Sequence, residues 1–294
     1  MAAGPEEIKT RLENIHSIEP LLAALRTISL SNWRFALNKI EVAKDYLQQL
    51  LSIYSQIPAS VSGKGPLSSP ENHLLIVIGS NRGLCSNFNR DLLDILSRIL
   101  SESADETRLV VIGERLRKTL ERRKIRYDRY LPFPSAAHLN PTFSLDLFNQ
   151  YIIPHLGSHV ELLFNRYRGA GQYRTIRSEV FPNTFIQLST RAFPLEEFIF
   201  DTNPDEIRAY LYEHLYQLSI YFALLSSAAS EHSTRFQLME NASSNAQRLA
   251  EQLLIEVQVQ RRQKITSEMQ ELAIGAGLLK KAENQTSSTG SKKF

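Results

Sequence analysis

The stretch LYEHLYQLSIYFALLSSAASEHSTRFQLM, residues 211–239, decides the fold. Its apolar residues recur in alternating steps of four and three, which is the heptad pattern of a helix that packs along a second helix. The stretch lies within residues 205–274, where neither glycine nor proline occurs. As one helix, that segment would extend about 105 Å, far beyond the usual helix of a globular protein. The pattern is formed by Leu211, Leu215, Leu218, Phe222, Leu225, Ala229, His232, Phe236 and Met239, and it continues at Ala246, Ala250, Leu253 and Val257.

A second apolar seam runs through residues 8–57, which also contain no glycine. It fails only at Glu19, Arg26 and Ser29, and Pro20 in the same region is expected to kink the helix. This shorter helix is the obvious antiparallel partner of the C-terminal one, so one end of the longer helix should project beyond the pair. A seam with one polar defect suggests that something other than the partner helix makes contact there.

Between the two helices the sequence changes character. Short apolar runs bounded by turn residues predict buried strands at 73–79, 109–112 and 160–164, with a third strand between the last two at 125–133. Helical spacing alternates with them at 88–100, 115–123 and 143–156, and residues 172–180 could extend the sheet. We therefore predict an α/β fold: an α/β domain with a mainly parallel sheet, inserted into a long antiparallel coiled coil. The predicted boundaries are 1–58, 59–203 and 204–282, followed by a disordered tail at 283–294.

Composition restricts the possible functions. The chain is 43% hydrophobic and 22% charged, as in a folded protein, and its formal charge of +3 is too small to indicate nucleic-acid binding. One cysteine, Cys85, excludes an internal disulfide framework. We find no secretory signal, and the most apolar run, residues 215–229, is too short for a membrane span. Any membrane association is therefore expected to come through a partner.

The loop at residues 79–89 follows the first strand and opens a helix, where a phosphate site would lie in a nucleotide-binding fold. It has neither a G-x-G-x-x-G nor a Walker pattern, so a structural turn is the better interpretation. Cys85 is interpreted as a small buried thiol, and His232 as a core histidine. No acid–base pair or metal cluster stands out, so we expect no catalytic residue, metal site or cofactor.

Two basic stretches remain open to interpretation. Residues 122–129 end a predicted helix and could touch nucleic acid, with Tyr127 for stacking, although a solvated helix end is more common. The second stretch, Arg261, Arg262, Gln263 and Lys264, lies where the seam of the C-terminal helix turns polar. It is either a solvated face or a contact surface for another protein.

Three segments together resemble one family. SNRGLCSNFN at 80–89 is similar to the S-D-R-G-L-C-G-x-x-N motif of ATP synthase γ subunits. MENASSNA at 239–246 resembles the family's M-x-N-A-[ST]-x-N-A. RRQKITSE at 261–268, followed by Gly275 and Ala276, is similar to its R-Q-x-x-I-T-x-E and G-A. The matching positions are Ser80, Arg82, Gly83, Leu84, Cys85, Asn89, Asn241, Asn245, Ile265, Thr266 and Glu268.

The resemblance implies a non-catalytic rotor shaft. In the family, the coiled coil fills the hollow of an α₃β₃ head and a Rossmann-like foot rests on the ε subunit and the membrane c-ring. Rotation then makes the three β sites cycle through different nucleotide affinities. The location implied is the cytoplasmic face of a bacterial plasma or thylakoid membrane, reached only through the complex. The expected contacts with the head are Arg26, Arg261, Arg262 and Gln263.

The chain also departs from the family pattern. Ser86 stands where the family has glycine, Asn81 where it has aspartate, and Leu25 where it has methionine. Arg262 replaces the glutamine of the R-Q pair, although Gln263 follows it. Residues 24–29 and 165–174 look closer to the alternate, N-type class of bacterial γ subunits. A divergent paralogue with altered coupling, a coiled-coil nucleic-acid adaptor and a small hydrolase using the 80–89 loop are the alternatives.

Overall fold

The computed structural model describes residues 5–57, 69–103, 107–153, 158–180 and 201–275. It contains two compact units, one made of residues 1–24 with 240–294 (unit 1) and one made of residues 25–239 (unit 2). Helices α1 (Pro5–Gln56) and α6 (Pro204–Gly275) each contribute to both units. The tail predicted to be disordered, residues 283–294, lies outside the described residues.

Unit 2 contains a five-stranded sheet with the order β3-β2-β1-β4-β5. Its neighbouring strands are parallel except for β4 and β5, which form an antiparallel hairpin. This confirms the predicted α/β fold with a mainly parallel sheet. The strands are β1 (Ser69–Ile78), β2 (Thr107–Ile112), β3 (Arg129–Leu131), β4 (Ser158–Gly169) and β5 (Gln172–Glu179).

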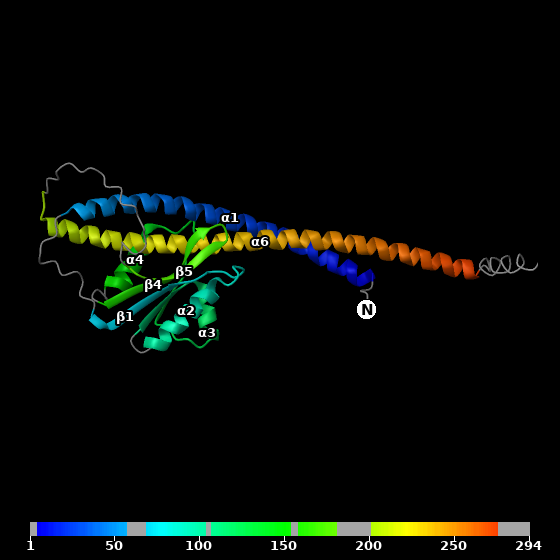
Figure 1. The fold of residues 1–294 in the computed structure, drawn as a ribbon, viewed down its shortest axis with the longest axis horizontal. Helices are drawn as coiled ribbons and strands as arrows, with labels where there is room; N and C mark the ends of the chain where they lie inside the picture. The colour runs from blue at the N-terminus through cyan, green and yellow to red at the C-terminus, as the bar shows by residue number, and fades with distance from the viewer. Residues whose placement is uncertain (1–4, 58–68, 104–106, 154–157, 181–200, 276–294) are drawn as a thin grey trace, which may run out of the picture. The chain divides into compact units, whose positions relative to one another are not determined.

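Helices cover both faces of this sheet (Figure 1). Successive residues of β1 point to opposite faces, so Leu75 and Val77 enter the core beneath α2 and α3, whereas Ile76 and Ile78 pack toward α1 and α6. The predicted helix at 143–156 is divided into α4, capped by the Asn140 side chain, and a short π-helical turn, and its last three residues lie outside the described residues. The bounds are α2 (Phe88–Ser103), α3 (Glu114–Arg122), α4 (Pro141–Leu147) and η1 (Phe148–Ile152).

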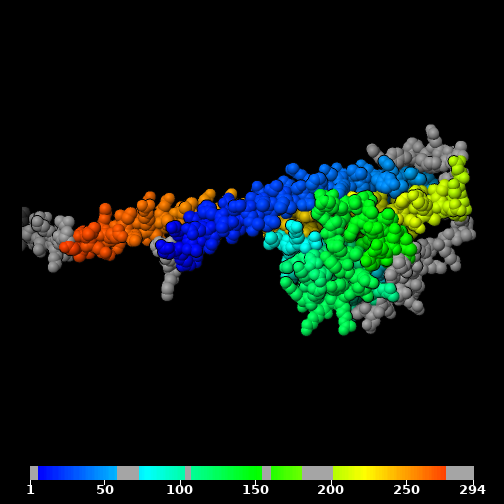
Figure 2. All heavy atoms as spheres, turned by 180° about the vertical axis from the view of Figure 1, so that it is seen from behind, coloured from blue at the N-terminus to red at the C-terminus, as the bar shows by residue number. Residues whose placement is uncertain are grey.

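The apolar seams of α1 and α6 are buried in unit 2 as their spacing predicts. Leu215, Leu225 and Ala229 of α6 are fully buried, as are Ala36 and Leu47 of α1. Small side chains at the seam allow the helices and the sheet to approach closely. The outer face of α1 is left open in the space-filling view (Figure 2). Exposed apolar side chains on α1 in this unit are Ile28, Phe35, Val42, Tyr46 and Ile53.

One prediction about the polar defect is wrong. Ser29, as part of that defect, was expected to contact something other than the partner helix, but it is only 1% exposed. Its hydroxyl donates to the Leu25 carbonyl at 2.7 Å, within α1 itself. A buried serine satisfied by the preceding helical turn needs no external partner, so its position on the seam carries no signal for one.

Unit 1 contains the N-terminal end of α1 and the C-terminal part of α6. Ile8, Ala250 and Leu253 are buried, and the Gln247 amide donates to the Glu19 carboxylate at 3.3 Å. Glu19 therefore has a polar partner within this unit. Pro20 lies inside α1, which continues through it as helix. After Gln260, described α6 residues are exposed apart from the half-buried Ala273, which is where the seam was predicted to end.

Candidate functional site

The 80–89 loop connects β1 to α2 and is closed by Ser80 and Asn89. The Ser80 amide donates to the Asn89 side-chain oxygen at 3.0 Å, and the Asn89 amide group donates to the Ser80 hydroxyl at 2.7 Å. Ser80 is completely buried. These two bonds explain why the family motif begins with serine and ends with asparagine, since each residue satisfies the polar groups of the other.

A buried ion pair from α6, Glu231 with Arg235, holds the loop; we call it the latch. The Glu231 carboxylate accepts from the amides of Asn81 and Arg82 at 3.3 and 3.4 Å. Arg235 bonds Glu231 and also donates to the carbonyls of Gly83 and Arg82 at 3.1 and 3.2 Å. Both latch side chains are at most 6% exposed. The latch therefore joins the long helix to the α/β domain through charge-assisted bonds shielded from water.

The same contacts close the position where a nucleotide-binding fold would hold a phosphate. The loop amides of Asn81 and Arg82, which could donate to an anion, already donate to the Glu231 carboxylate. In the first turn of α3, the amides of Arg115 and Leu116 donate to the Ser80 carbonyl at 3.1 and 3.4 Å. A Cβ on Gly113 would lie 2.6 Å from the Gly79 carbonyl oxygen, so no side chain fits there either. The hydrolase alternative therefore has no open anion site in this loop.

Cys85 is buried beneath the loop, with its thiol 3.6 Å from the Arg82 carbonyl. Burial raises the pKa of the thiol, and the nearby Glu231 carboxylate raises it further. A protonated, enclosed thiol is a poor nucleophile, which supports the interpretation of Cys85 as a structural residue.

In a complex of the kind that the family resemblance implies, replacing Cys85 by serine or alanine should leave ATP hydrolysis near the wild-type rate. The loss in local stability should be about 1–3 kcal/mol, because only a small buried group is removed. Hydrolysis assays and hydrogen exchange of the loop amides measure the two effects. A complex that assembles with Cys85→Ala but is inactive would contradict the structural role.

The loop turns through left-handed backbone at two residues that are not glycine. Leu84 has φ +61° and Ser86 has φ +54°. Ser86 occupies the position where the family motif has glycine, and this dihedral explains the family's preference, since glycine adopts a positive φ without a Cβ penalty. The described loop is thus slightly strained in this chain.

Ser86→Gly should stabilise the loop by a few tenths to about 1 kcal/mol, because relief of the left-handed strain outweighs the extra freedom of the unfolded chain. Hydrogen exchange of residues 80–89 in the assembled complex should slow. Ser31→Gly, exposed in the interior of α1, is the matched control and should destabilise its helix. Faster exchange in the Ser86 variant would show that its left-handed backbone carries no strain.

His232 lies beside the latch, with its Nδ1 atom 3.1 Å from the Arg235 guanidinium. Burial lowers the pKa of His232 to about 4, despite the opposing effect of Glu231. The imidazole is therefore neutral at pH 7 and can accept the arginine bond. The structure confirms a hydrogen-bonded core histidine, and the described residues contain no group of metal-ligating side chains.

This depressed pKa makes the latch region sensitive to acid. Between pH 6.5 and about 4 the unfolded chain binds a proton at His232 that the folded chain does not, so stability falls as pH falls. The full effect is on the order of 3 kcal/mol. Hydrogen exchange of the α6 amides reports local stability at pH 7.5 and pH 5. The loss of local stability between these two pH values should be larger in wild type than in His232→Gln. Parallel pH dependences would contradict the assignment.

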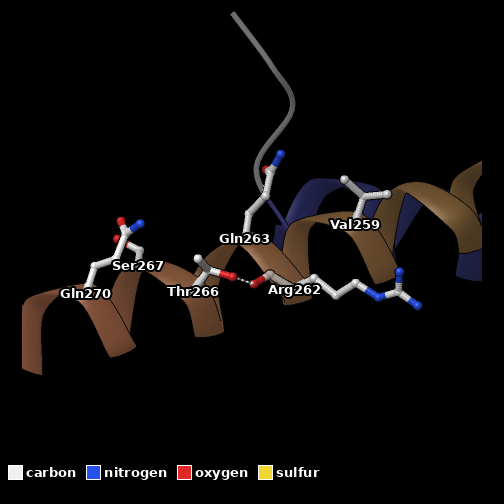
Figure 3. Close-up of a pocket in the computed structure, with 6 residues that line it drawn as sticks. All are labelled: Val259, Arg262, Gln263, Thr266, Ser267 and Gln270. Atoms are coloured by element: carbon white, nitrogen blue, oxygen red, sulfur yellow. Dashed lines mark hydrogen bonds between the residues drawn. The ribbon is translucent and has the colours of Figure 1, made fainter. Parts of the chain in front are cut away.

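The second candidate site is the end of α6 in unit 1. Arg261, Arg262 and Gln263 are all exposed, and in Figure 3 the Arg262 and Gln263 side chains leave the helix in different directions. The Thr266 hydroxyl donates to the Arg262 carbonyl at 2.9 Å. Among the described residues, neither arginine has a hydrogen-bond or ion-pair partner for its guanidinium. This part of α6 therefore presents fork-shaped donors that are free to bind carboxylates or carbonyls.

The predicted site residues thus fall into two groups. The structure brings Ser80, Arg82, Gly83, Leu84, Cys85 and Asn89 together at the latch, in unit 2. Arg26, also in unit 2, is half-buried on α1. Asn241, Asn245, Ile265, Thr266 and Glu268 lie in unit 1 and are exposed on α6, like Arg261, Arg262 and Gln263.

Sequence reasoning did not assign the latch residues a role. A usable signal was present, because Glu231 and Arg235 stand four residues apart on the least charged stretch of α6. Opposite charges at that spacing face the same side of a helix, and here that side is the apolar one. A charged pair on a buried face indicates a specific polar partner.

Beside the latch is a hollow of about 230 Å³ that reaches the surface. Its apolar wall includes Leu25 and Ile28 of α1 and Leu84 of the loop, and the latch residues with His232 form its polar side. Ile28 and Leu84 are 49% and 57% exposed at this hollow. Apolar side chains left open around a polar floor are typical of a protein contact surface.

The tyrosines in and beside the basic stretch at 122–129 are engaged in contacts within the chain. The Tyr127 hydroxyl donates to Glu121 at 3.0 Å, and the ring packs on the core beneath α2 and α3. Tyr130 is likewise engaged, by the Arg117 guanidinium 5.1 Å from its ring centre. Both rings already make contacts within the chain, so the adaptor alternative gains no support.

The family model described as ATP synthase matches residues 5–279. The chain belongs to the ATP synthase γ family. It is 25% identical over 285 residues to the ATP synthase gamma chain of Fusobacterium nucleatum, covering 94% of this chain and 99% of the relative. It is 26% identical over 299 residues to the gamma chain of Bdellovibrio bacteriovorus, with coverages of 95% and 99%. Both relatives are ATP synthase gamma chains, in agreement with the family model.

Solved structures show the same fold. The rotor of the Euglena gracilis mitochondrial ATP synthase superposes with a TM-score of 0.62 at 15% identity, over 89% of this chain and 98% of that chain. The central stalk and c-ring structure from Tetrahymena thermophila gives 0.56 at 22% identity, over 76% and 99%. The fold therefore persists at low sequence identity. Within the described residues, no helix is long and apolar enough to cross a membrane.

Proposed function

We propose that this chain is the non-catalytic rotor shaft of a rotary ATP synthase, turning within an α₃β₃ head and coupling ion flow through a membrane c-ring to ATP synthesis or hydrolysis. The observation that carries the proposal is the exposed end of α6. Ile265, Met269 and Leu272 are 45%, 67% and 73% exposed there. Apolar side chains repeated along a bare helix are expected to be covered by a surrounding partner.

The mechanism follows from stiffness and asymmetry. A long helix whose exposed apolar and cationic groups lie on one side contacts each surrounding subunit differently as it turns. Such differential contacts bias each catalytic subunit toward one conformation in turn. The latch supports this role, because it fastens α6 to the α/β domain and so resists relative slippage under torque.

Arg261, Arg262 and Gln263 are proposed to engage the head during each turn. The exposed guanidinium groups of the two arginines can donate to a carboxylate or a backbone carbonyl on a β-subunit loop. Arg26, half-buried on α1, and the hollow lined by Leu25, Ile28 and Leu84 are proposed as a second contact with the head. The occupied anion position at the 80–89 loop supports a subunit that performs no chemistry itself.

The proposed partners are the α and β subunits, the ε subunit and the c-ring. The chain would reach the cytoplasmic face of a membrane only through that complex. The solved structures with a similar fold contain stalk, rotor, F1 and c-ring components, which supports this set of partners.

Cysteine cross-linking tests the proposal. In a Cys85→Ser background, Met269→Cys should form disulfide cross-links to α or β subunits that carry cysteines on their inner surface. Arg126→Cys, exposed in the α/β domain, is the control and should give none with the same subunits. The proposal fails if α and β do not co-purify with the chain, or if only the control position cross-links.

A further inference from the structure

The tip of the β4–β5 hairpin carries three arginines. Arg166 of β4 stands directly opposite Arg174 of β5, and Arg168 follows on β4. Arg168 and Arg174 are exposed, and Arg166 is half-buried. Within the described part of the chain, none of the three has a hydrogen bond or an ion pair. We refer to Arg166, Arg168 and Arg174 as the arginine cluster.

Electrostatic repulsion among these three arginines destabilises the hairpin of the isolated chain. Like charges directly opposite each other destabilise a strand pair. Burial lowers the pKa of Arg166, and the positive charge of Arg168 lowers it further. The hairpin thus holds a partly desolvated cation next to two others without a counter-charge, which indicates that an anion is supplied from outside.

The hairpin is also held rigidly. The Tyr167 amide donates to the Ser226 hydroxyl at 2.9 Å, and the Ser230 hydroxyl donates to the Asn165 carbonyl at 2.9 Å. Gly171 turns the tip at φ +66°, and a Cβ there would lie 3.2 Å from the Gln237 side chain. The arginines are therefore presented from a strand pair fixed on α6, and a ligand would not have to order the backbone.

The spacing favours carboxylates on a protein. Side chains opposite each other in an antiparallel pair have Cβ atoms about 4.5–5.5 Å apart. Acidic residues one turn apart on a helix have Cβ atoms about 5–6 Å apart, so one arginine can meet each carboxylate. Nucleic acid is disfavoured because both nearby tyrosines are engaged. Tyr167 packs 6.3 Å from Trp33, and Tyr173 donates to Asp91 at 2.7 Å.

We propose that the arginine cluster is a docking surface for an acidic helical segment of a partner subunit, with carboxylates one turn apart. The inference rests on the proposed function for the presence of such subunits. It adds a contact outside the three family motifs at 80–89, 239–246 and 261–268. The contact is a set of bidentate arginine–carboxylate bonds made from the hairpin, separate from both the latch and the end of α6.

Zero-length coupling tests this contact in the assembled complex. Carbodiimide joins a carboxyl group to an amine only when the two touch, and arginine does not react. Arg174→Lys and Arg166→Lys keep the charge and supply the amine. Mass spectrometry should then find new peptide bonds to Asp or Glu of another subunit, and their yield should fall as salt is raised. Arg126→Lys, exposed in the other basic stretch, is the control.

Three results would overturn the inference. The first is an assembled complex in which the hairpin variants couple no better to other subunits than the control. The second is coupling confined to carboxylates of this chain. The third is binding of the complex to phosphatidylglycerol vesicles that disappears in Arg166→Gln/Arg168→Gln/Arg174→Gln, because the anion would then be a lipid phosphate. Co-purification of α and β is scored separately, so the shaft proposal and the hairpin contact fail independently.

Discussion

Arg235→Met is expected to release the 80–89 loop from α6. The substitution leaves the Glu231 carboxylate buried without its cation, and breaking a buried pair in this way costs about 3–5 kcal/mol. The carbonyls of Arg82 and Gly83 lose their donor as well. Hydrogen exchange of the Asn81 and Arg82 amides in the assembled complex should therefore accelerate by at least two orders of magnitude, if it is limited by local opening.

The double variant Glu231→Leu/Arg235→Met provides the control. Removing both charges eliminates the uncompensated carboxylate, so the loop should exchange more slowly than in Arg235→Met alone. It should still exchange faster than wild type, because the two loop amides have lost their acceptor. Equal exchange in wild type and Arg235→Met, or additive losses in the double variant, would show that the latch does not hold the loop.

Arg261→Ala/Arg262→Ala should leave the complex assembled but slow its ATP hydrolysis and reduce its torque. Both side chains are exposed, so unit 1 loses no buried contact. If they bond the head in only part of the cycle, removing one or two charge-assisted bonds of about 1.5–3 kcal/mol should slow the step that needs them about tenfold or more. Steady-state hydrolysis and single-molecule rotation measure these effects.

Matched variants distinguish a specific contact of Arg261 and Arg262 with the head from a general effect of losing positive charge. Arg122→Ala/Arg123→Ala removes the same charge from an exposed helix end in the α/β domain and should have little effect. Arg261→Lys/Arg262→Lys should give an intermediate rate, since lysine keeps the charge but lacks the planar fork. A double alanine variant that hydrolyses and rotates like wild type would mean that the basic cluster is only a solvated face.

The helical part of the fold was predictable because its signal is periodic. The heptad spacing of α6 identified positions that are buried or half-buried down to Val257, and the point near Gln260 where burial ends. Buried apolar runs likewise identified β1, β2 and the start of β4. The short β3 was overestimated as residues 125–133, since an edge strand of three residues has too few apolar positions to define its ends.

The polar contacts were less predictable because they depend on pairs distant in sequence. Ser29 looked like a defect in the seam, yet a hydroxyl can bond its own helix and remain buried. The latch pairs Glu231 with amides about 150 positions earlier, which no local pattern encodes. The positive φ at Ser86 explains why the family has glycine there, although the resemblance alone gave no reason for it.

Direct observation of rotation is the most direct test of the shaft. A bead would be attached at Arg126→Cys in a Cys85→Ser chain, with the α₃β₃ head fixed to a surface through α or β. The account predicts that adding ATP drives continuous rotation of the bead in one direction, and that Arg261→Ala/Arg262→Ala slows it. A head that hydrolyses ATP with this chain bound while the bead stays still would contradict the account.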